Sequence, residues 1–247
     1  MTAEAVVRWE ENALTGWPAL RTELRGGWAL RFAFGYSKRA NSVHPLYKTS
    51  PRDSGERIRE CEAAYHRAGL PSTFKLPSHS AWAGLDRALA SRGYETVDPS
   101  RVLTRDLPPS SSVHRGFHSL ETFTEAWHDG FFGANGVALG QRNTARAMAF
   151  LVDRPVVGWV EQSGTPMGWG YAAVVGRQAW IYDVVVSPAV RRRGYGRVLV
   201  RGLMEEARAK GATQACLQVV ATNAQANALY EGLGFTEAYR YHYRRKE

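Results

Sequence analysis

Seven consecutive residues have the side chains and spacing of an anion-binding loop: Arg191, Arg192, Arg193, Gly194, Tyr195, Gly196 and Arg197. The β-branched run from Ile181 to Val186 before them predicts a buried strand, which Pro188 ends. Apolar residues spaced three and four apart from Val198 to Ala207 predict a helix that begins near Gly194. The pattern is therefore a strand, a short basic loop and the start of a helix.

Such a loop can hold a phosphate, because the first N–H groups of a helix have no partner inside the helix. The helix dipole adds about half a positive charge there, and arginines add forked donors. Gly194 and Gly196 lack the Cβ that would keep a phosphate away from the backbone. An ordinary turn with solvated arginines is the simpler interpretation. The dinucleotide fingerprint is excluded because it needs glycine in place of Leu199, and a Walker loop because Gly-Lys-Ser/Thr is absent.

Two motifs in this region resemble those of the GNAT superfamily of N-acetyltransferases. Arg191, Gly194 and Gly196 match the superfamily's acetyl-CoA loop, Gln/Arg-x-x-Gly-x-Gly/Ala. Downstream, Asn223 to Phe235 is similar to its closing segment, Asn-x-x-Ala-x-x-Leu-Tyr-x-x-x-Gly-Phe. The two motifs stand in the order that the superfamily has, and the resemblance covers residues 140–247.

The resemblance implies a role for each matching position. The implied cofactor-binding positions are the backbone of Val184, Val185 and Val186 for the pantetheine arm, the amides from Arg192 to Arg197 for the pyrophosphate, and Asn223 for the cofactor arm. Tyr230 would protonate the departing CoA thiolate, since a phenol with a pKa of about 10 stays protonated at neutral pH. The alternative for Tyr230 is a core aromatic on an amphipathic helix.

A general base is harder to assign from the residues. Asp183, in the strand before the loop, could accept the ammonium proton or hold a cationic acceptor. It could equally face a partner in the sheet or cap a bulge. Glu161, two strands earlier, is a weaker candidate. Three histidines are expected to be surface or structural residues: His114, His118 and His128. Three tryptophans are expected to pack in the core, although one of them could line the acceptor channel: Trp159, Trp169 and Trp180.

Length, charge and cysteine usage limit the other classes of function. Lys and Arg exceed Asp and Glu by 32 to 23, giving a net charge of +9, but no long basic block indicates nucleic acid. The sequence has no metal-ligand spacing, no signal-peptide run and no stretch of transmembrane length. We therefore expect a cytoplasmic protein without metal or membrane partners. Cys61 and Cys216 are expected to be buried and reduced, which favours direct transfer over an acetyl-enzyme.

The N-terminal half echoes the C-terminal half. Leu89 to Glu95 resembles Tyr230 to Thr236, with a helix end, a glycine, an aromatic residue and a strand. The first half has no Gly-x-Gly after Pro45, and it has Leu89 at the position of Tyr230. We therefore expect that it kept the fold and lost the cofactor site; coincidental similarity is the alternative.

The expected fold class is α/β (an α+β mixed sheet), with two GNAT-like halves that each have a mostly antiparallel sheet flanked by helices. Residues 1–107 form the degenerate half, 108–114 a Pro/Ser-rich linker, and 115–247 the catalytic domain. Besides the elements already named, helices are predicted over 4–16, 53–67, 83–91, 120–129 and 142–151, and strands over 19–25, 28–34, 40–43, 72–76, 94–97, 101–105, 156–162, 167–175, 215–220 and 237–243.

The function expected is transfer of an acetyl group from acetyl-CoA to a primary amine of a small molecule, in a ternary complex, by a monomer or homodimer. A protein or peptide N-acetyltransferase is the first alternative. A non-catalytic acyl-CoA sensor is the second, although a pure binder has no use for Tyr230. A nucleic-acid binder is supported by charge alone.

Overall fold

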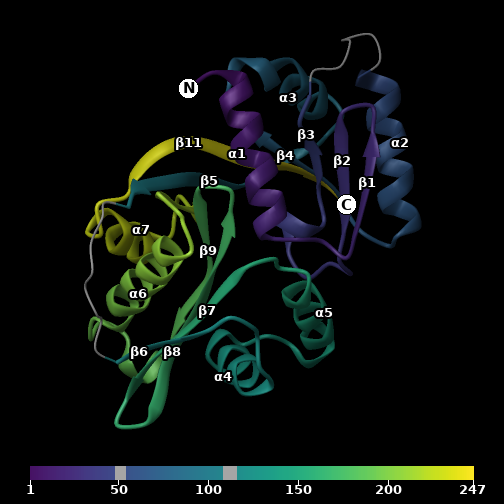
Figure 1. The fold of residues 1–247 in the computed structure, drawn as a ribbon. Coiled ribbons are helices and arrows are strands. Elements are labelled where there is room, and N and C mark those ends of the chain that lie inside the picture. Colours follow the sequence, from purple (N-terminus) through teal and green to yellow (C-terminus); the bar gives the residue numbers. More distant parts are fainter. Residues whose placement is uncertain (48–53, 108–115) are drawn as a thin grey trace.

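A computed structural model describes residues 1–47, 54–107 and 116–247, so the predicted linker lies outside the described residues. Within them are seven α-helices and one mixed sheet of 11 strands (Figure 1). The helices are α1 (Ala3–Gly16), α2 (Ser54–Arg67), α3 (Ala83–Ala90), α4 (Glu125–Asn135), α5 (Leu139–Phe150), α6 (Tyr195–Ala209) and α7 (Ala224–Glu231). The strands are β1 (Arg21–Arg25), β2 (Trp28–Phe32), β3 (Val43–Pro45), β4 (Ser72–Pro77), β5 (Glu95–Asp106), β6 (Phe117–Leu120), β7 (Pro155–Gln162), β8 (Thr165–Val175), β9 (Gln178–Val186), β10 (Gln214–Val220) and β11 (Thr236–Lys246).

The two halves repeat one order of elements, and the mixed α/β fold class is confirmed. In the first half, β1, β2 and β3 are antiparallel, α2 follows, and β4 returns parallel to β3. In the second half, β7, β8 and β9 are antiparallel, α6 follows, and β10 returns parallel to β9. A helix connects each parallel pair, as such crossovers require.

The last strand of each half is exchanged, and the sheet is continuous through both halves. Its order is β1-β2-β3-β4-β11-β5-β10-β9-β8-β7-β6. Strand β5 of the first half pairs with β10 of the second, whereas β11 of the second half pairs with β4 of the first. Figure 1 shows β5 and β11 side by side where they run between the two halves. Each half therefore completes the sheet of the other.

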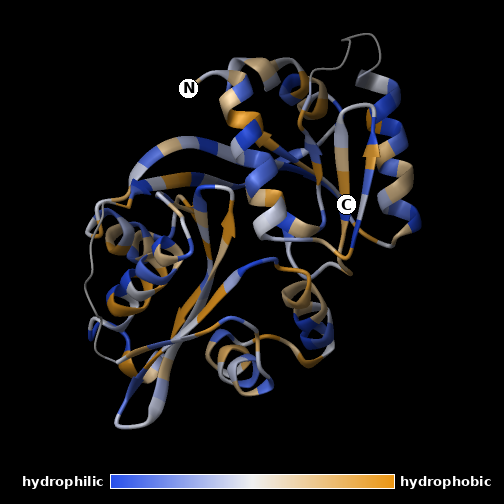
Figure 2. Ribbon diagram, in the orientation of Figure 1, coloured by the Kyte–Doolittle hydropathy of each residue, from blue (hydrophilic) through white to orange (hydrophobic). Residues whose placement is uncertain are grey.

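Helices cover both faces of the second half of the sheet. Helix α6 lays its apolar stripe over β7, β8 and β9, and it buries Leu199, Leu203 and Ala207. On the opposite face, α4 and the N-terminal helix α1 pack against β8 and β9. Figure 2 shows apolar residues along these strands and mixed polar and apolar residues along the helices. A helix of the first half thus helps to build the core of the second.

Three of the predicted elements differ from the structure for reasons that lie in the local backbone. The strand predicted at 40–43 is a 3-10 turn over Lys38–Ala40 followed by β3, since the Ser37 hydroxyl accepts a hydrogen bond from the Ala40 amide. The strands at 94–97 and 101–105 are one strand, β5, which passes Pro99 through a positive φ of 46° at Asp98. Part of the helix predicted over 120–129 is β6, and α4 begins only after its N-cap, Thr124.

Among the helices of the described chain, none has both the length and the apolar character needed to cross a membrane.

Candidate active site

Strands β9 and β10 separate halfway along their length and leave a gap in the sheet. Their parallel pairing runs from Gln178↔Gln214 to Ile181↔Leu217 and then ends, although β9 continues to Val186. A bulge follows at once, because Asp183 has a φ of 53° and the register with β8 shifts between Trp169 and Tyr171. The backbone of Val184, Val185 and Val186 therefore borders this gap, on the side that β10 has left.

The basic loop lies at the end of β9 and presents free amides. The N–H groups from Arg192 to Gly196 have no hydrogen-bond acceptor among the described residues, and the side chains of Arg192 and Arg193 are exposed. Gly194 has a φ of 88°, which favours glycine, and it is the N-cap residue of α6. At Gly196 a Cβ would come 3.2 Å from Leu229 Cδ2. The geometry has the features of an anion site at a helix N-terminus.

Two arginines of the loop have structural contacts. Arg191 Nε donates a hydrogen bond to the Val186 carbonyl at 3.3 Å, which ties the loop to the end of β9. Arg197 Nη1 donates to the Gly232 carbonyl at 2.7 Å, which joins the start of α6 to the end of α7. The arginines left to meet an anion are thus Arg192 and Arg193.

Helix α7 brings the second motif to the same region. Tyr230 is 8% exposed and packs edge-on against Phe235, with ring centroids 5.9 Å apart. Burial raises the pKa of Tyr230 to about 12, and the positive charge of Arg39 partly opposes this. Asn223 is the N-cap of α7, because its Oδ1 accepts a hydrogen bond from the Ala226 amide at 3.0 Å. Its amide nitrogen has no bond to the described residues.

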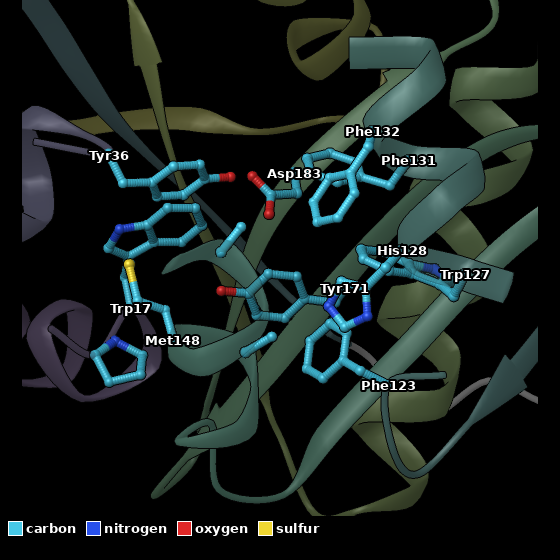
Figure 3. Close-up of a pocket in the computed structure, with 13 residues that line it drawn as sticks. Trp17, Tyr36, Phe123, Trp127, His128, Phe131, Phe132, Met148, Tyr171 and Asp183 are labelled. Atoms are coloured by element: carbon cyan, nitrogen blue, oxygen red, sulfur yellow. The ribbon is translucent and has the colours of Figure 1, made fainter. Parts of the chain in front are cut away.

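Asp183 lines a pocket with aromatic walls (Figure 3). The pocket lies between α1, the loop after β2, α4, α5 and strands β8 and β9; its lining includes Trp17, Tyr36, His128, Phe132, Tyr171 and Asp183. In Figure 3 the Tyr36 hydroxyl points toward the Asp183 carboxylate. Burial raises the pKa of Asp183 to about 7, and the charge of Arg39 again opposes the rise. The charge of Arg39 thus lowers the pKa of both Asp183 and Tyr230.

The pocket also contains residues that the sequence did not single out. His128 was expected at the surface or in a structural role, but it lies in the pocket wall and is 6% exposed. Its Nδ1 lies 3.1 Å from the Thr124 carbonyl, and its Nε2 is buried with no hydrogen-bond partner among the described residues. Burial lowers the pKa of His128, so the ring is neutral and Nε2 can accept a hydrogen bond. Tyr36 lines the pocket from the N-terminal half of the chain.

The remaining candidates lie elsewhere. Glu161, on β7, faces His118 with 3.3 Å between carboxylate and ring nitrogen, and it does not line the pocket. Trp169 and Trp180 are core residues, and Trp159 packs against the same core. His114 falls outside the described residues. Both cysteines are buried and free, and burial raises the pKa of each thiol to about 12.

The counterpart position in the first half is a different kind of pocket. It lies between the end of β3, the start of α2 and α3, and α1 crosses it; Pro45, Ser54, Trp82 and Leu85 are among its lining. Leu89, which matches Tyr230, is fully buried. Most of the loop after β3, residues 48–53, is outside the described residues. Within the described ranges, no cluster of three or more His, Cys, Asp or Glu side chains could hold a metal ion.

Comparison with known proteins gives the family. A family model described as "Probable histone acetyltransferase Rv0428c C-terminal" matches residues 3–244. The "Uncharacterized N-acetyltransferase YobR" of Bacillus subtilis is 31% identical over 247 residues, covering 96% of this chain and 97% of YobR. The ribosomal protein bS18-alanine N-acetyltransferase of Escherichia coli K12 is 39% identical over 139 residues, which are 56% of this chain and 80% of that enzyme.

A solved structure shows the same fold over nearly the whole length. The GCN5-related N-acetyltransferase from Kribbella flavida superposes with a TM-score of 0.72 at 16% identity, and 97% of this chain and 95% of that chain are covered. The family match and the YobR alignment each span both halves. The chain therefore belongs to the GNAT-type N-acetyltransferases, in the family described as a probable histone acetyltransferase Rv0428c C-terminal.

Proposed function

We propose that this acyltransferase moves an acetyl group from acetyl-CoA directly to a primary amine of a small molecule. The observation that carries the proposal is the gap between β9 and β10. It begins beside Asp183 and continues toward a loop with free amides, and Tyr230 belongs to the core cluster against which Val184 packs. A thioester donor with a diphosphate needs these features together: an anion cradle, an open strand edge and a proton donor.

On the donor side, amides from Arg192 to Gly196 would bind the pyrophosphate, with Arg192 and Arg193 adding charge and Arg191 and Arg197 holding the loop. Backbone groups of Val184, Val185 and Val186 would form hydrogen bonds with the pantetheine arm, which would take the place of a neighbouring strand. Asn223 keeps an amide nitrogen that could donate to the same arm. When bound, acetyl-CoA supplies the thioester that the amine attacks.

The proton transfers are assigned to two residues, one a general base and the other a general acid. The ammonium proton of the acceptor passes to Asp183, whose pKa of about 7 suits a base at neutral pH. The amine nitrogen then bonds to the acetyl carbon and the carbon–sulfur bond breaks. Tyr230, with its pKa raised to about 12, gives its proton to the leaving thiolate, and the phenolate so formed takes the second N–H proton from the nitrogen of the new amide. Because both thiols are buried and protonated, an acetylated cysteine is not part of the proposal.

The walls of the aromatic pocket favour a small acceptor over a protein. Its walls come from both halves of the chain, including Trp17 and Tyr36 from the first. A protein N-terminus is the second candidate, because the relative from E. coli is named for the alanine of a ribosomal protein. That relative aligns with 56% of this chain, and the rest of the chain has no counterpart in the alignment.

The test is release of free thiol from acetyl-CoA with a panel of primary amines, comparing wild type with Tyr230→Phe. We expect turnover to fall about 10²- to 10⁴-fold, as for loss of a general acid, while calorimetry gives an unchanged acetyl-CoA affinity. Tyr47→Phe is the matched control, since Tyr47 is 53% exposed and lies in the first half. An unchanged rate in Tyr230→Phe would remove Tyr230 from the mechanism. Absence of acetyl-CoA binding to the wild type would overturn the proposal itself.

A further inference from the structure

Helix α7, which carries Tyr230, has little apolar surface to hold it in place. Of its eight residues only Asn227 and Tyr230 are buried, and one of these two is polar. Ala226 and Leu229 pack against the neighbouring core but are only partly buried. A helix of this length is not stable by itself, so its position depends on contacts with the rest of the fold. Polar contacts must therefore contribute to fixing the place of Tyr230.

Asn227 ties the beginning of α7 to the end of β10. Its Nδ2 donates hydrogen bonds to the Asn223 carbonyl at 2.8 Å and to the Val220 carbonyl at 3.1 Å. Its Oδ1 accepts a hydrogen bond from Arg101 Nη1 at 2.7 Å. Leaving one polar atom of a buried amide without a partner costs free energy. Arg101 thus supplies the bond that completes this network.

Arg101 reaches α7 from the other half of the chain. It lies on β5, the exchanged strand of the first half, and its side chain is 18% exposed. The same Nη1 lies 2.7 Å from Glu231 Oε1, at the last residue of α7, and Nε donates to Glu237 Oε2 of β11 at 2.7 Å. Figure 1 shows α7 close to β5. One guanidinium therefore fastens α7 at its middle and at its end through charge-assisted hydrogen bonds.

The two residues that Arg101 holds on α7 lie on either side of Tyr230 in the sequence. Asn227 is three residues before Tyr230, so both are on the same face of the helix, and Glu231 follows directly. A shift of α7 would therefore move the phenol with it. Proton transfer needs the donor within hydrogen-bond reach, and an error of about 1 Å in placement can cost about 10²-fold in rate.

We propose that Arg101 is a positioning residue, which holds α7 so that the Tyr230 hydroxyl reaches the leaving thiolate. The inference rests on the proposed function and extends it to the first half of the chain. That half then serves the reaction through a strand that it places beside the second motif. Arg101 acts through Asn227 and Glu231 and does not touch the reacting atoms.

The first arm of the experiment measures amide hydrogen exchange by mass spectrometry. Arg101→Met keeps the aliphatic stem of the side chain and removes every donor. Arg240→Met is the matched control, because Arg240 lies opposite Arg101 on β11 and donates to the same Glu237 at 2.7 Å. Within the described chain, the Arg240 side chain has no bond to α7. We expect exchange over residues 224–231 to become about 10-fold faster in Arg101→Met and to stay at the wild-type rate in the control.

The second arm is a double-mutant cycle on thiol release with the panel of primary amines. We expect Arg101→Met to lower kcat about 10-fold and to leave the acetyl-CoA affinity from calorimetry unchanged. In a Tyr230→Phe background the same replacement should cost nothing further, because the proton donor is already absent. Arg101→Lys should restore part of kcat, since an ammonium lacks the fork that serves several partners at once. Arg240→Met should keep the wild-type kcat.

Several results would overturn the inference and leave the proposed function intact. One is an unchanged kcat, or unchanged exchange over α7, in Arg101→Met. Another is an equal loss of kcat with and without the Tyr230 hydroxyl, which would show that Arg101 acts on the donor site or on the fold. A third is the same loss in Arg240→Met, which would assign the effect to the charge at Glu237.

Two other results concern the proposed function itself. Wild-type kcat in Tyr230→Phe would remove the proton donor that Arg101 is meant to hold, and it would overturn both proposals. Failure of the wild type to acetylate any amine would contradict the proposed function alone, because the exchange measurement still decides whether Arg101 holds α7.

Discussion

Partial burial of Asp183 raises the pKa of its carboxyl group, which suits the proposed role as a base but is costly to the fold. The position is held at a bulge with a φ of 53°, a conformation that aspartate and asparagine adopt more readily than most residues. Because the folded pKa is about 7 and the ordinary value is 3.8, the folded state holds an extra proton between these pH values. Stability attributable to Asp183 therefore decreases as pH rises from 3.8 to 7, and the full cost remains above 7.

Asp183→Asn is expected to lose activity and gain stability. Without the base, kcat/KM should fall about 10²- to 10⁴-fold, and the wild-type rise in rate with a pKa near 7 should vanish. Melting temperatures should be equal near pH 4 and higher for the variant at pH 8. Asp153→Asn, at an exposed position of the same half, is the control. A stability difference that does not change with pH would contradict a partly buried carboxylate whose pKa is raised by folding.

At the scale of elements, a buried charge cluster joins α1 to three strands. Lys75 of β4 donates to Glu10 of α1 at 2.7 and 2.8 Å, and the Tyr239 hydroxyl of β11 donates to Glu10 at 2.6 Å. His44 of β3 lies 3.7 Å from the same carboxylate. Burial opposes ionisation of Glu10, but Lys75 and His44 outweigh it and lower its pKa to about 2. Burial lowers the pKa of His44 to about 4.

This cluster predicts acid sensitivity in a defined window. Both folded pKa values lie below the ordinary ones, 6.5 for His44 and 4.5 for Glu10, so their stability is present above those values. It decreases as pH falls from about 6.5 to 4 through His44, and further toward 2 through Glu10. Glu10→Gln leaves the buried charge of Lys75 without its partner. It should lower the free energy of unfolding in urea by about 3–5 kcal/mol at pH 7.

The measurement is unfolding free energy against pH for wild type, Glu10→Gln and Glu60→Gln, the last at an exposed position on α2. The penalty for Glu10→Gln should shrink as pH approaches 2, where the wild-type carboxylate also becomes protonated. If the penalty is small and constant across pH, the cluster does not hold α1 to the sheet.

Local patterns predicted the elements well, while pairings between distant elements escaped them. The strand, loop and helix around Gly194 follow from periodicity and from glycine chemistry, which act within a few residues. The contact of Arg39 with Tyr182 joins residues about half of the chain apart, and no local pattern encodes it. For the same reason the sequence did not mark His128 as a pocket residue, because His128 lines the pocket through the packing of α4 against β8.

For the whole molecule, the exchange of β5 and β11 makes the halves interdependent. A strand pattern shows that a segment pairs but does not show its partner, so alternation in the sequence could not predict the exchange. Residues 116–247 expressed alone would leave β10 without β5 and β11 without both β4 and β5. They would also lose α1 from the face of β8 and β9.

We expect that fragment to lack a cooperative melting transition and acetyltransferase activity, and co-expression with residues 1–107 to restore both. Circular dichroism melts and thiol-release assays provide the measurement, with the intact chain as reference. A fragment 116–247 that melts cooperatively at the wild-type temperature would show that the exchanged strands contribute little.

The exchanged strands also limit how ligands can enter and leave. Strands β5 and β11 are long, and each follows one half in the chain but forms hydrogen bonds with a strand of the other half. Together they link the two halves across their boundary. A hinge opening of one half away from the other would have to tear those ladders apart. Ligands must therefore enter and leave the site through movements of side chains and short loops at its mouth. The two halves stay fixed relative to each other during the catalytic cycle.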